Sequence, residues 1–112
     1  MEKPSSDTSY IYILIDPRDE WEVYVGTSIN PQKRIKELNH KHINHYGKAV
    51  SEWALELREL NLLPKMQVIE KCPTEIRRES ERSWITHYLE QGFDLLNFDG
   101  VERKYGLKNR WE

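Results

Sequence analysis

Basic side chains concentrate in one stretch of the sequence, residues 30–50, where they could bind phosphate groups. The stretch contains a single acidic residue, Glu37, so it is electropositive although the whole chain is slightly acidic. Its cations could neutralise a phosphate ester, but the same pattern is typical of a solvated helix face, and charge alone leaves both interpretations open. The basic and histidine residues of the stretch are Lys33, Arg34, Lys36, His40, Lys41, His42, His45 and Lys48.

A second candidate is Glu81, a carboxylate that helical periodicity turns toward the protein interior. At about 100° per residue it falls between Trp84 and Ile85 on the apolar face of the last predicted helix, whereas Glu79 points away from that face. A buried carboxylate needs an arginine, a hydrogen-bond network or a metal ion, because burial without a partner is costly. The two alternatives are a structural ion pair with Arg34 and a functional carboxylate.

The histidines and the cysteine offer a weak case for a zinc site. His40, His42 and His45 form an H-x-H-x-x-H pattern, but this spacing matches no closed zinc site and no cysteine lies near it in the sequence. Cys72 is the single cysteine of the chain, so it cannot form an intramolecular disulfide. We expect this thiol to take no part in chemistry in a reducing cytoplasm.

Length and composition fit one small soluble domain. The 112 residues include 17 Lys+Arg and 19 Asp+Glu, and the net charge of -2 argues against a highly basic nucleic-acid coat protein. No run approaches the ~20 apolar residues of a membrane span. The polar start, residues 1–9, lacks the pattern of a secretion signal. We therefore expect a cytoplasmic protein without a membrane partner.

The N-terminal part of the sequence predicts a β-hairpin followed by a helix. Residues 10–15 form an unbroken β-branched and aromatic run, and residues 21–26 form the returning strand after a turn rich in Asp and Pro. Asn30 supplies a helix N-cap acceptor and Pro31 suits the first helical position, so a helix should begin there. Arg34 would then flank the apolar face of that helix.

The rest of the sequence predicts two more helices and one strand. Apolar residues follow helical spacing from position 50 to Leu60, and Pro64 closes that segment before a short strand over residues 66–69. The last helix should begin at Pro73 and end at Gly92. The predicted fold class is α+β, a small three-stranded sheet flanked by helices in the order ββααβα.

Two tripeptides in the hairpin carry a family resemblance. Residues 10–12, Tyr-Ile-Tyr, stand where the GIY-YIG nuclease family has Gly-Ile-Tyr, and residues 24–26, Tyr-Val-Gly, stand where it has Tyr-Ile-Gly. Either tripeptide alone is a weak signal. Together with Arg34, Glu81 and Asn97 in matching order and spacing, they make the sequence similar to this family over nearly the whole chain.

Two positions depart from the family pattern. Tyr10 replaces the first glycine, a change that we expect the hairpin to tolerate. Leu38 occupies the position at which many members have a histidine, four residues after the arginine. His40 or His42 could take the place of that histidine, or no residue does.

The resemblance implies hydrolysis of phosphodiester bonds in DNA with one divalent metal ion, Mg²⁺ or Mn²⁺. Glu81 would be the metal ligand, and Arg34 would present its planar guanidinium to the scissile phosphate. Tyr12 or Tyr24 would orient or deprotonate the attacking water with help from a nearby cation, because an ordinary tyrosine, with a pKa of about 10, is a poor base; the choice between them stays open. Asn97 would tie down the chain end or contact the substrate.

The charge pattern and the family resemblance also predict the interaction partners and the boundaries of the domain. The expected DNA-binding residues are Lys33, Arg34, Lys36, His40, Lys41 and His42. Target specificity would come from a homodimer or a partner protein. The alternative is a catalytically silent domain of the same fold that binds DNA or a protein without cutting. The expected boundaries are a flexible segment over 1–8, the nuclease-like domain over 9–99 and a basic, aromatic tail over 100–112.

Overall fold

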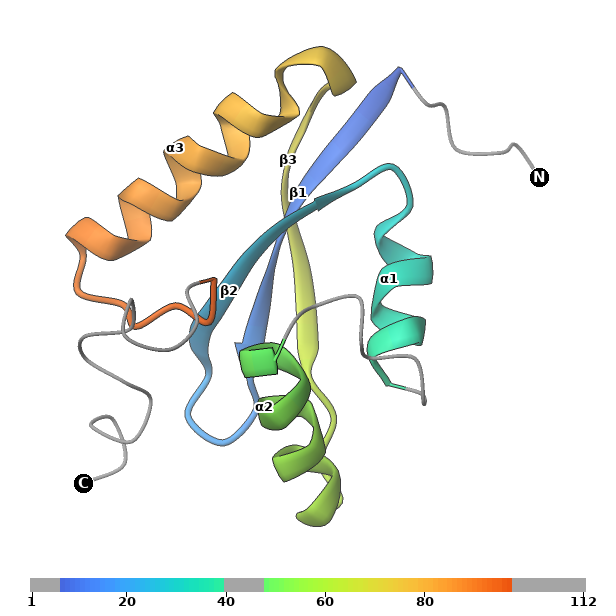
Figure 1. Cartoon of the computed structure of the whole chain (residues 1–112), viewed down its shortest axis with the longest axis vertical. Coiled ribbons are helices and arrows are strands. Elements are labelled where there is room, and N and C mark those ends of the chain that lie inside the picture. The colour runs from blue at the N-terminus through green and yellow to red at the C-terminus, as the bar shows by residue number, and fades with distance from the viewer. Residues whose placement is uncertain (1–6, 40–47, 98–112) are drawn as a thin grey trace.

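A three-stranded antiparallel sheet forms the centre of the protein. The computed structural model describes residues 7–39 and 48–97. In this part of the chain β1 (Thr8–Asp16) is the middle strand, flanked by β2 (Trp21–Ser28) and β3 (Lys65–Pro73), so the strand order is β2-β1-β3 (Figure 1). The sheet therefore brings the two tyrosine-containing strands of the hairpin into direct contact.

Helices cover both faces of this sheet. On one face lie α1 (Pro31–Leu38) and α2 (Lys48–Glu59); on the other lies α3 (Arg77–Glu90), which follows a 3-10 turn over Thr74–Ile76 (Figure 1). The order ββααβα is the one predicted from the sequence. No helix in the described part of the chain is long and apolar enough to cross a membrane.

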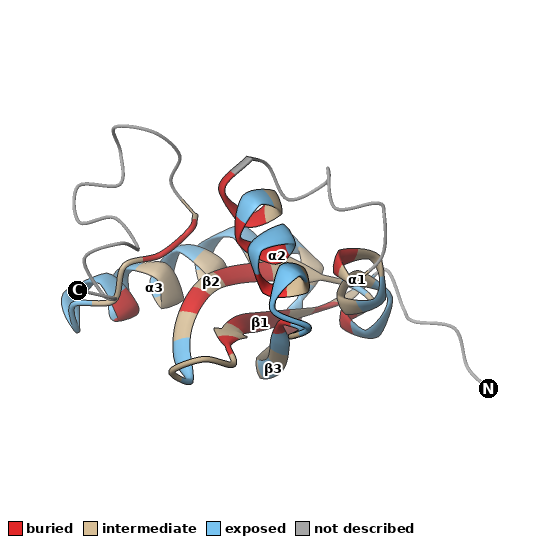
Figure 2. Ribbon diagram, turned by 90° about the horizontal axis from the view of Figure 1, so that it is seen from below, coloured by how far each residue is buried: buried red, intermediate tan, exposed pale blue. Residues whose placement is uncertain are grey.

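The central strand β1 contributes to two separate cores because its side chains alternate between the faces. Tyr12 and Leu14 belong to the cluster beneath α1 and α2, while Ile11 and Ile13 belong to the cluster beneath α3. All four are at most 2% exposed, and Figure 2 shows how buried residues gather on β1 and β2. Covered faces on both sides explain why residues 10–15 form an unbroken apolar run.

A bulge in β2 places Val23 on a face that simple alternation does not give. Leu14 pairs with Tyr24 and Ile15 pairs with Glu22, so Val23 is the extra residue between these pairs. Val23 consequently packs in the cluster of Leu14 and α2, whereas Val25, two residues later, packs in the α3 cluster. The bulge therefore turns Val23 toward the face of the sheet that α2 covers.

The buried carboxylate of Asp16 anchors the hairpin turn to α2. Its two oxygens accept hydrogen bonds from the Arg18 guanidinium at 2.8 and 3.0 Å, and from the Trp53 Nε1 at 2.8 Å. Burial by itself raises the pKa of Asp16, but the hydrogen bonds from Arg18 and Trp53 outweigh it and hold this pKa below its ordinary value. Asp16, which belongs to the predicted turn rich in Asp and Pro, is thus also a buried anion that stabilises the fold.

Several predicted boundaries differ from those observed. The third strand covers Lys65–Pro73 and not the short stretch 66–69, because its full length pairs with β1. Leu60, predicted on the apolar face of the second helix, lies beyond α2 and is 53% exposed. The left-handed backbone of Asn61, with φ of 61°, follows it and turns the chain away from helical geometry.

Candidate functional site

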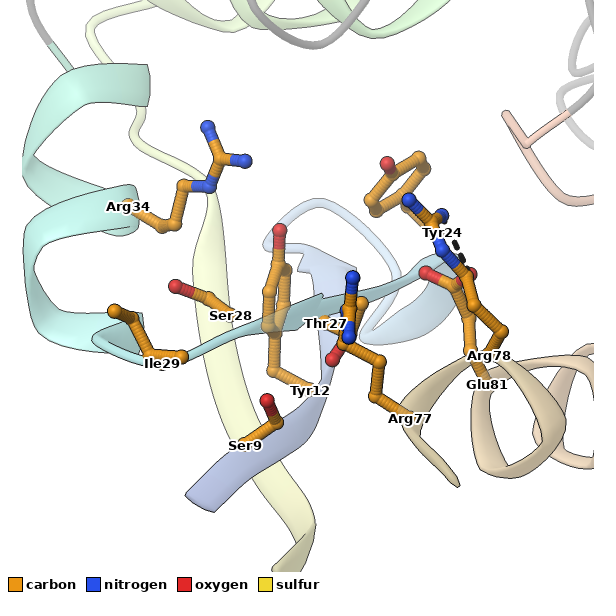
Figure 3. Close-up of a pocket in the computed structure, with 10 residues that line it drawn as sticks. All are labelled: Ser9, Tyr12, Tyr24, Thr27, Ser28, Ile29, Arg34, Arg77, Arg78 and Glu81. Carbon is orange, nitrogen blue, oxygen red and sulfur yellow. Dashed lines mark ion pairs between the residues drawn. The ribbon is translucent and has the colours of Figure 1, made fainter. Parts of the chain in front are cut away.

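A polar pocket of about 260 Å³ lies where the hairpin meets α1 and α3 (Figure 3). Four residues that the sequence singled out, from four different elements, line it: Tyr12, Tyr24, Arg34 and Glu81. Its other lining residues are Ser9, Thr27, Ser28, Ile29, Arg77 and Arg78. Among the described residues, the pocket therefore collects two phenols, three guanidinium groups, one carboxylate and several hydroxyls in one space.

The position of Tyr12 depends on the glycine opposite it. Tyr12 pairs with Gly26 across the β1–β2 ladder, and a Cβ on Gly26 would lie 2.5 Å from the Tyr12 hydroxyl oxygen. Only a residue without a side chain leaves room for the ring there. The Tyr12 ring lies 6.4 Å from that of Tyr24, and both rings line the pocket.

Arg34 reaches the pocket because α1 begins directly after β2. The backbone N–H of Asn30 donates to Ser28 Oγ at 2.9 Å, and Asn30 Oδ1 accepts from the backbone N–H of Lys33 at 3.2 Å, which confirms the predicted N-cap. These bonds fix the first turn of α1 to the end of β2. The Arg34 guanidinium is 37% exposed and lies 3.9 Å from the Glu37 carboxylate, a long and therefore weak ion pair.

Glu81 faces the pocket from α3 with its side chain 19% exposed. Its carboxylate lies 3.8 Å from the Arg78 guanidinium on the same helix. Burial raises the pKa of the Glu81 carboxyl above its ordinary value, although Arg78 and Arg77 oppose this shift. The structural ion pair between Glu81 and Arg34 that the sequence left open is not formed, and the guanidinium paired with Glu81 is that of Arg78.

The other residues of α3 follow the predicted helical faces in part. Tyr88 is buried, and Trp84 and Ile85 pack against the α3 cluster, as expected. Leu89, which the same periodicity would turn inward, is 43% exposed. Glu79 is exposed on a different side of the helix from Glu81, as predicted.

Asn97 lies beside the pocket and is bound to the edge of β2. Its Oδ1 accepts from the Val25 backbone N–H at 3.0 Å and its Nδ2 donates to the Val25 carbonyl at 2.7 Å. The neighbouring Leu96 backbone N–H donates to the Val23 carbonyl. Asn97 thus takes the place of a neighbouring strand next to Tyr24, and it is not among the residues that line the pocket.

The predicted DNA-binding residues are only partly gathered at this site. Lys33 and Lys36 are exposed on α1 and do not line the pocket, whereas Arg34 does. Lys41, His40 and His42 lie outside the described residues, as does His45.

Sequence reasoning missed the contribution of α3 to the positive charge of the pocket. Arg77 and Arg78 stand four and three residues before Glu81, a spacing that places all three on one side of a helix. That spacing was the available signal. The hydroxyls of Ser9, Thr27 and Ser28 carried no such signal, because only the strand pairing brings them together.

The donor set of the pocket suits a hard divalent cation. Among residues 7–39 and 48–97 no group of three or more His, Cys, Asp or Glu side chains could hold a metal ion. Glu81 is the carboxylate that lines the pocket, accompanied by phenol and hydroxyl oxygens. Zinc sites use several nitrogen or sulfur ligands, whereas Mg²⁺ is commonly held by one or two carboxylates, water and substrate phosphate. The residues present therefore fit an ion of the Mg²⁺ type.

Fold and family comparison together define the class of the protein, a domain of a nuclease family. The family model of the GIY-YIG catalytic domain matches residues 8–94, so the chain belongs to the GIY-YIG family. Domains of this family are generally nucleases, act on nucleic acid and typically use divalent metal ions. The family and the fold class predicted from the sequence are confirmed. No curated protein and no solved structure gave a significant match.

Proposed function

We propose that the protein is a metal-dependent DNA endonuclease that hydrolyses phosphodiester bonds in this pocket. The observation that carries the proposal is the convergence of Tyr12, Tyr24, Arg34 and Glu81 in one polar space. These side chains lie far apart in the sequence, and each has a chemical use in phosphodiester hydrolysis. Asn97 supports them from the edge of β2 through both of its hydrogen bonds to Val25.

Glu81 would hold the cation, Mg²⁺ or Mn²⁺. An ion bound there would polarise the phosphate and stabilise the negative charge on the leaving oxygen. Glu81 is the one carboxylate in the described lining of the pocket, so water and phosphate oxygens of the substrate would have to supply the other ligands. Glu81 must be ionised to act as a ligand, so its raised pKa makes metal binding sensitive to acid.

Arg34 would bind the scissile phosphate from the α1 side of the pocket. A guanidinium is permanently charged and its planar fork matches two phosphate oxygens. Negative charge accumulates on these oxygens as water attacks, and a fixed cation is then worth more than in the ground state.

The hydroxyls of Tyr12 and Tyr24 would orient or deprotonate the attacking water. The described lining of the pocket contains three arginines, the nearby cations that such a role requires. Tyr12 is 2% exposed and held between Gly26 and the core, whereas Tyr24 is half-buried. Cleavage rates of Tyr12→Phe and Tyr24→Phe measured over a range of pH would identify the base. Removing the tyrosine that acts as the base should abolish the rise of the rate with increasing pH.

Plasmid cleavage tests the proposed activity. Supercoiled DNA should be converted to nicked or linear forms with Mg²⁺ or Mn²⁺ and should stay intact when EDTA is present. Binding without metal-dependent cleavage would instead favour the silent binding domain of the same fold. Cleavage rates on supercoiled, linear, nicked and branched substrates then define the preferred DNA. A separate measurement, the mass of the protein in solution with and without DNA, tests the predicted homodimer.

A further inference from the structure

The pocket has a second cationic wall that faces Arg34. Arg34 enters from α1 on one side, while Arg77 and Arg78 enter from the first turn of α3 on the other (Figure 3). Glu81 is the one carboxylate among the lining residues that the structure describes. A pocket with three guanidinium groups carries more positive charge than a single scissile phosphate requires, which points to contact with more than one phosphate of a DNA strand.

The two arginines of this wall are held differently. Arg77 Nη1 donates to the Thr74 carbonyl at 2.8 Å, so its guanidinium is tied to the turn that begins the helix. Arg78 has a side chain that is 73% exposed and lies 3.8 Å from the Glu81 carboxylate, beyond hydrogen-bond distance. An exposed ion pair of this length contributes little stability. Arg78 can therefore exchange partners at little cost.

We propose that Arg78 binds the DNA phosphate next to the scissile one, and that in the absence of DNA it shields the Glu81 carboxylate. This inference rests on the proposed function of the pocket. A divalent cation on Glu81 would be repelled by a guanidinium 3.8 Å from that carboxylate, so Arg78 must turn away when metal binds. A phosphate of the bound strand offers it two oxygens in exchange. DNA binding and metal binding then favour each other through this one side chain.

Arg82 provides a matched control on the same helix. It lies one turn beyond Arg78, is also exposed, and lines a separate hollow with Glu79 and His87. Arg78→Ala and Arg82→Ala remove the same charge from the same element, so nonspecific loss of positive charge affects both alike. Thermal melting of both variants checks that α3 is intact.

Fluorescence anisotropy with a labelled DNA duplex in EDTA measures the phosphate contact without cleavage. Arg78→Ala should weaken binding about tenfold at low salt, and it should reduce the slope of log affinity against log salt by about 0.9, the value for one lost phosphate contact. Arg82→Ala should keep the wild-type slope. Equal slopes for the two variants would overturn the role of Arg78.

Titration with Mn²⁺ in the absence of DNA measures the shielding of Glu81. Arg78→Ala should bind Mn²⁺ a fewfold more tightly than the wild type, because the competing cation is gone, and Arg82→Ala should not. Unchanged Mn²⁺ affinity in Arg78→Ala would overturn the shielding even if wild-type DNA cleavage remains metal-dependent. A wild type that neither binds nor cleaves DNA would overturn the proposed function and this inference together.

Discussion

The ring of Tyr12 lies across the backbone of Gly26, its pairing partner on β2. A Cβ at Gly26 would lie 2.5 Å from both Cζ and Oη of Tyr12 and 2.9 Å from Cε1. The last residue of one tripeptide therefore makes room for the last residue of the other. This contact gives a steric reason for a glycine in the Tyr-Val-Gly segment, and it directs the Tyr12 hydroxyl into the pocket.

Gly26→Ala should damage activity more than stability. The added methyl group must push the end of the Tyr12 ring away, because the backbone on either side is fixed in the sheet. We expect cleavage to fall by about tenfold or more, with a loss of unfolding free energy of about 1–3 kcal/mol from overpacking. Plasmid cleavage and urea unfolding of the same preparation give the two quantities.

Gly92→Ala is the control for the glycine substitution. Gly92 has φ of 91° and open space around its missing Cβ, so alanine there strains the backbone at the end of α3 without touching the pocket. It should lower stability by about 1 kcal/mol and leave the cleavage rate near that of the wild type. If Gly26→Ala cleaves as fast as Gly92→Ala, the contact with Tyr12 does not matter for the reaction.

Glu81→Gln and Glu79→Gln test whether Glu81 is the proposed metal ligand, with an exposed carboxylate on the same helix as the control. Glu81→Gln keeps the shape and hydrogen-bonding capacity of the side chain but removes the negative charge that a hard cation requires, so cleavage should fall by orders of magnitude. Glu79 is exposed outside the pocket, and its change should alter the rate by no more than a fewfold. Persistent cleavage in Glu81→Gln would remove Glu81 as the ligand.

The raised pKa of Glu81 also predicts how stability depends on pH. A carboxyl group whose folded-state pKa is above its unfolded value stabilises the fold below the unfolded pKa, and this contribution is lost as the pH rises through the folded pKa. At neutral pH Glu81→Gln should therefore melt at the same temperature as the wild type or slightly higher. The difference should vanish in acid, where Glu81 is protonated. A lower melting temperature at neutral pH would show that the ionised group stabilises the fold.

Arg34→Ala should reduce turnover more than DNA affinity. The guanidinium lines the pocket, where in the proposed reaction charge would develop on the phosphate, and removing one such donor typically costs about 10²- to 10³-fold in rate. Lys36→Ala, on the exposed side of the same helix, should weaken binding at low salt and change turnover little. Single-turnover rates and anisotropy titrations distinguish the two effects. Equal losses of rate and affinity in Arg34→Ala would make it a docking residue only.

Local patterns in the sequence predicted the fold wherever one interaction dominated. The N-cap at Asn30 depends on a nearby side chain, and the end of the last helix near Gly92 depends on a glycine that adopts a φ of 91°; both are confirmed. The predicted start of that helix at Pro73 is wrong, because Pro73 is paired in β3 and α3 begins at Arg77. The face of Val23 was not predictable, because the bulge that sets it depends on pairing with β1. Leu60 followed helical spacing but fell beyond the end of α2, since spacing alone does not show where a helix stops.

Family spacing and one helical face predicted four of the residues that line the pocket, and the sequence did not predict the rest of the lining. Glu81 was found twice, by its place near Trp84 and by the family motif, and it lines the pocket. The basic stretch drew attention to α1, whereas two of the three arginines in the described pocket lining, Arg77 and Arg78, come from the first turn of α3. Charge counting along the sequence cannot show that Arg77 and Arg78 face Arg34, because this depends on how α3 lies against the sheet.

Asp16→Asn should destabilise the fold most strongly at neutral pH. The carboxylate is fully buried and accepts from both the Arg18 guanidinium and the Trp53 indole, and the amide nitrogen of asparagine would face one of these donors. We expect a loss of about 2–3 kcal/mol of unfolding free energy, typical of a hydrogen bond to a charged group. Because the folded-state pKa of Asp16 is lowered, its stabilisation is present above the unfolded pKa and is lost as the pH falls through the folded pKa. The difference between Asp16→Asn and the wild type should therefore shrink in acid.

Glu56→Gln, which alters the exposed partner of Arg18, should change stability by about 0.5 kcal/mol at most. Urea unfolding from pH 7 down to pH 3 measures both variants, and a difference that stays constant over this range would contradict a stabilising charge on Asp16.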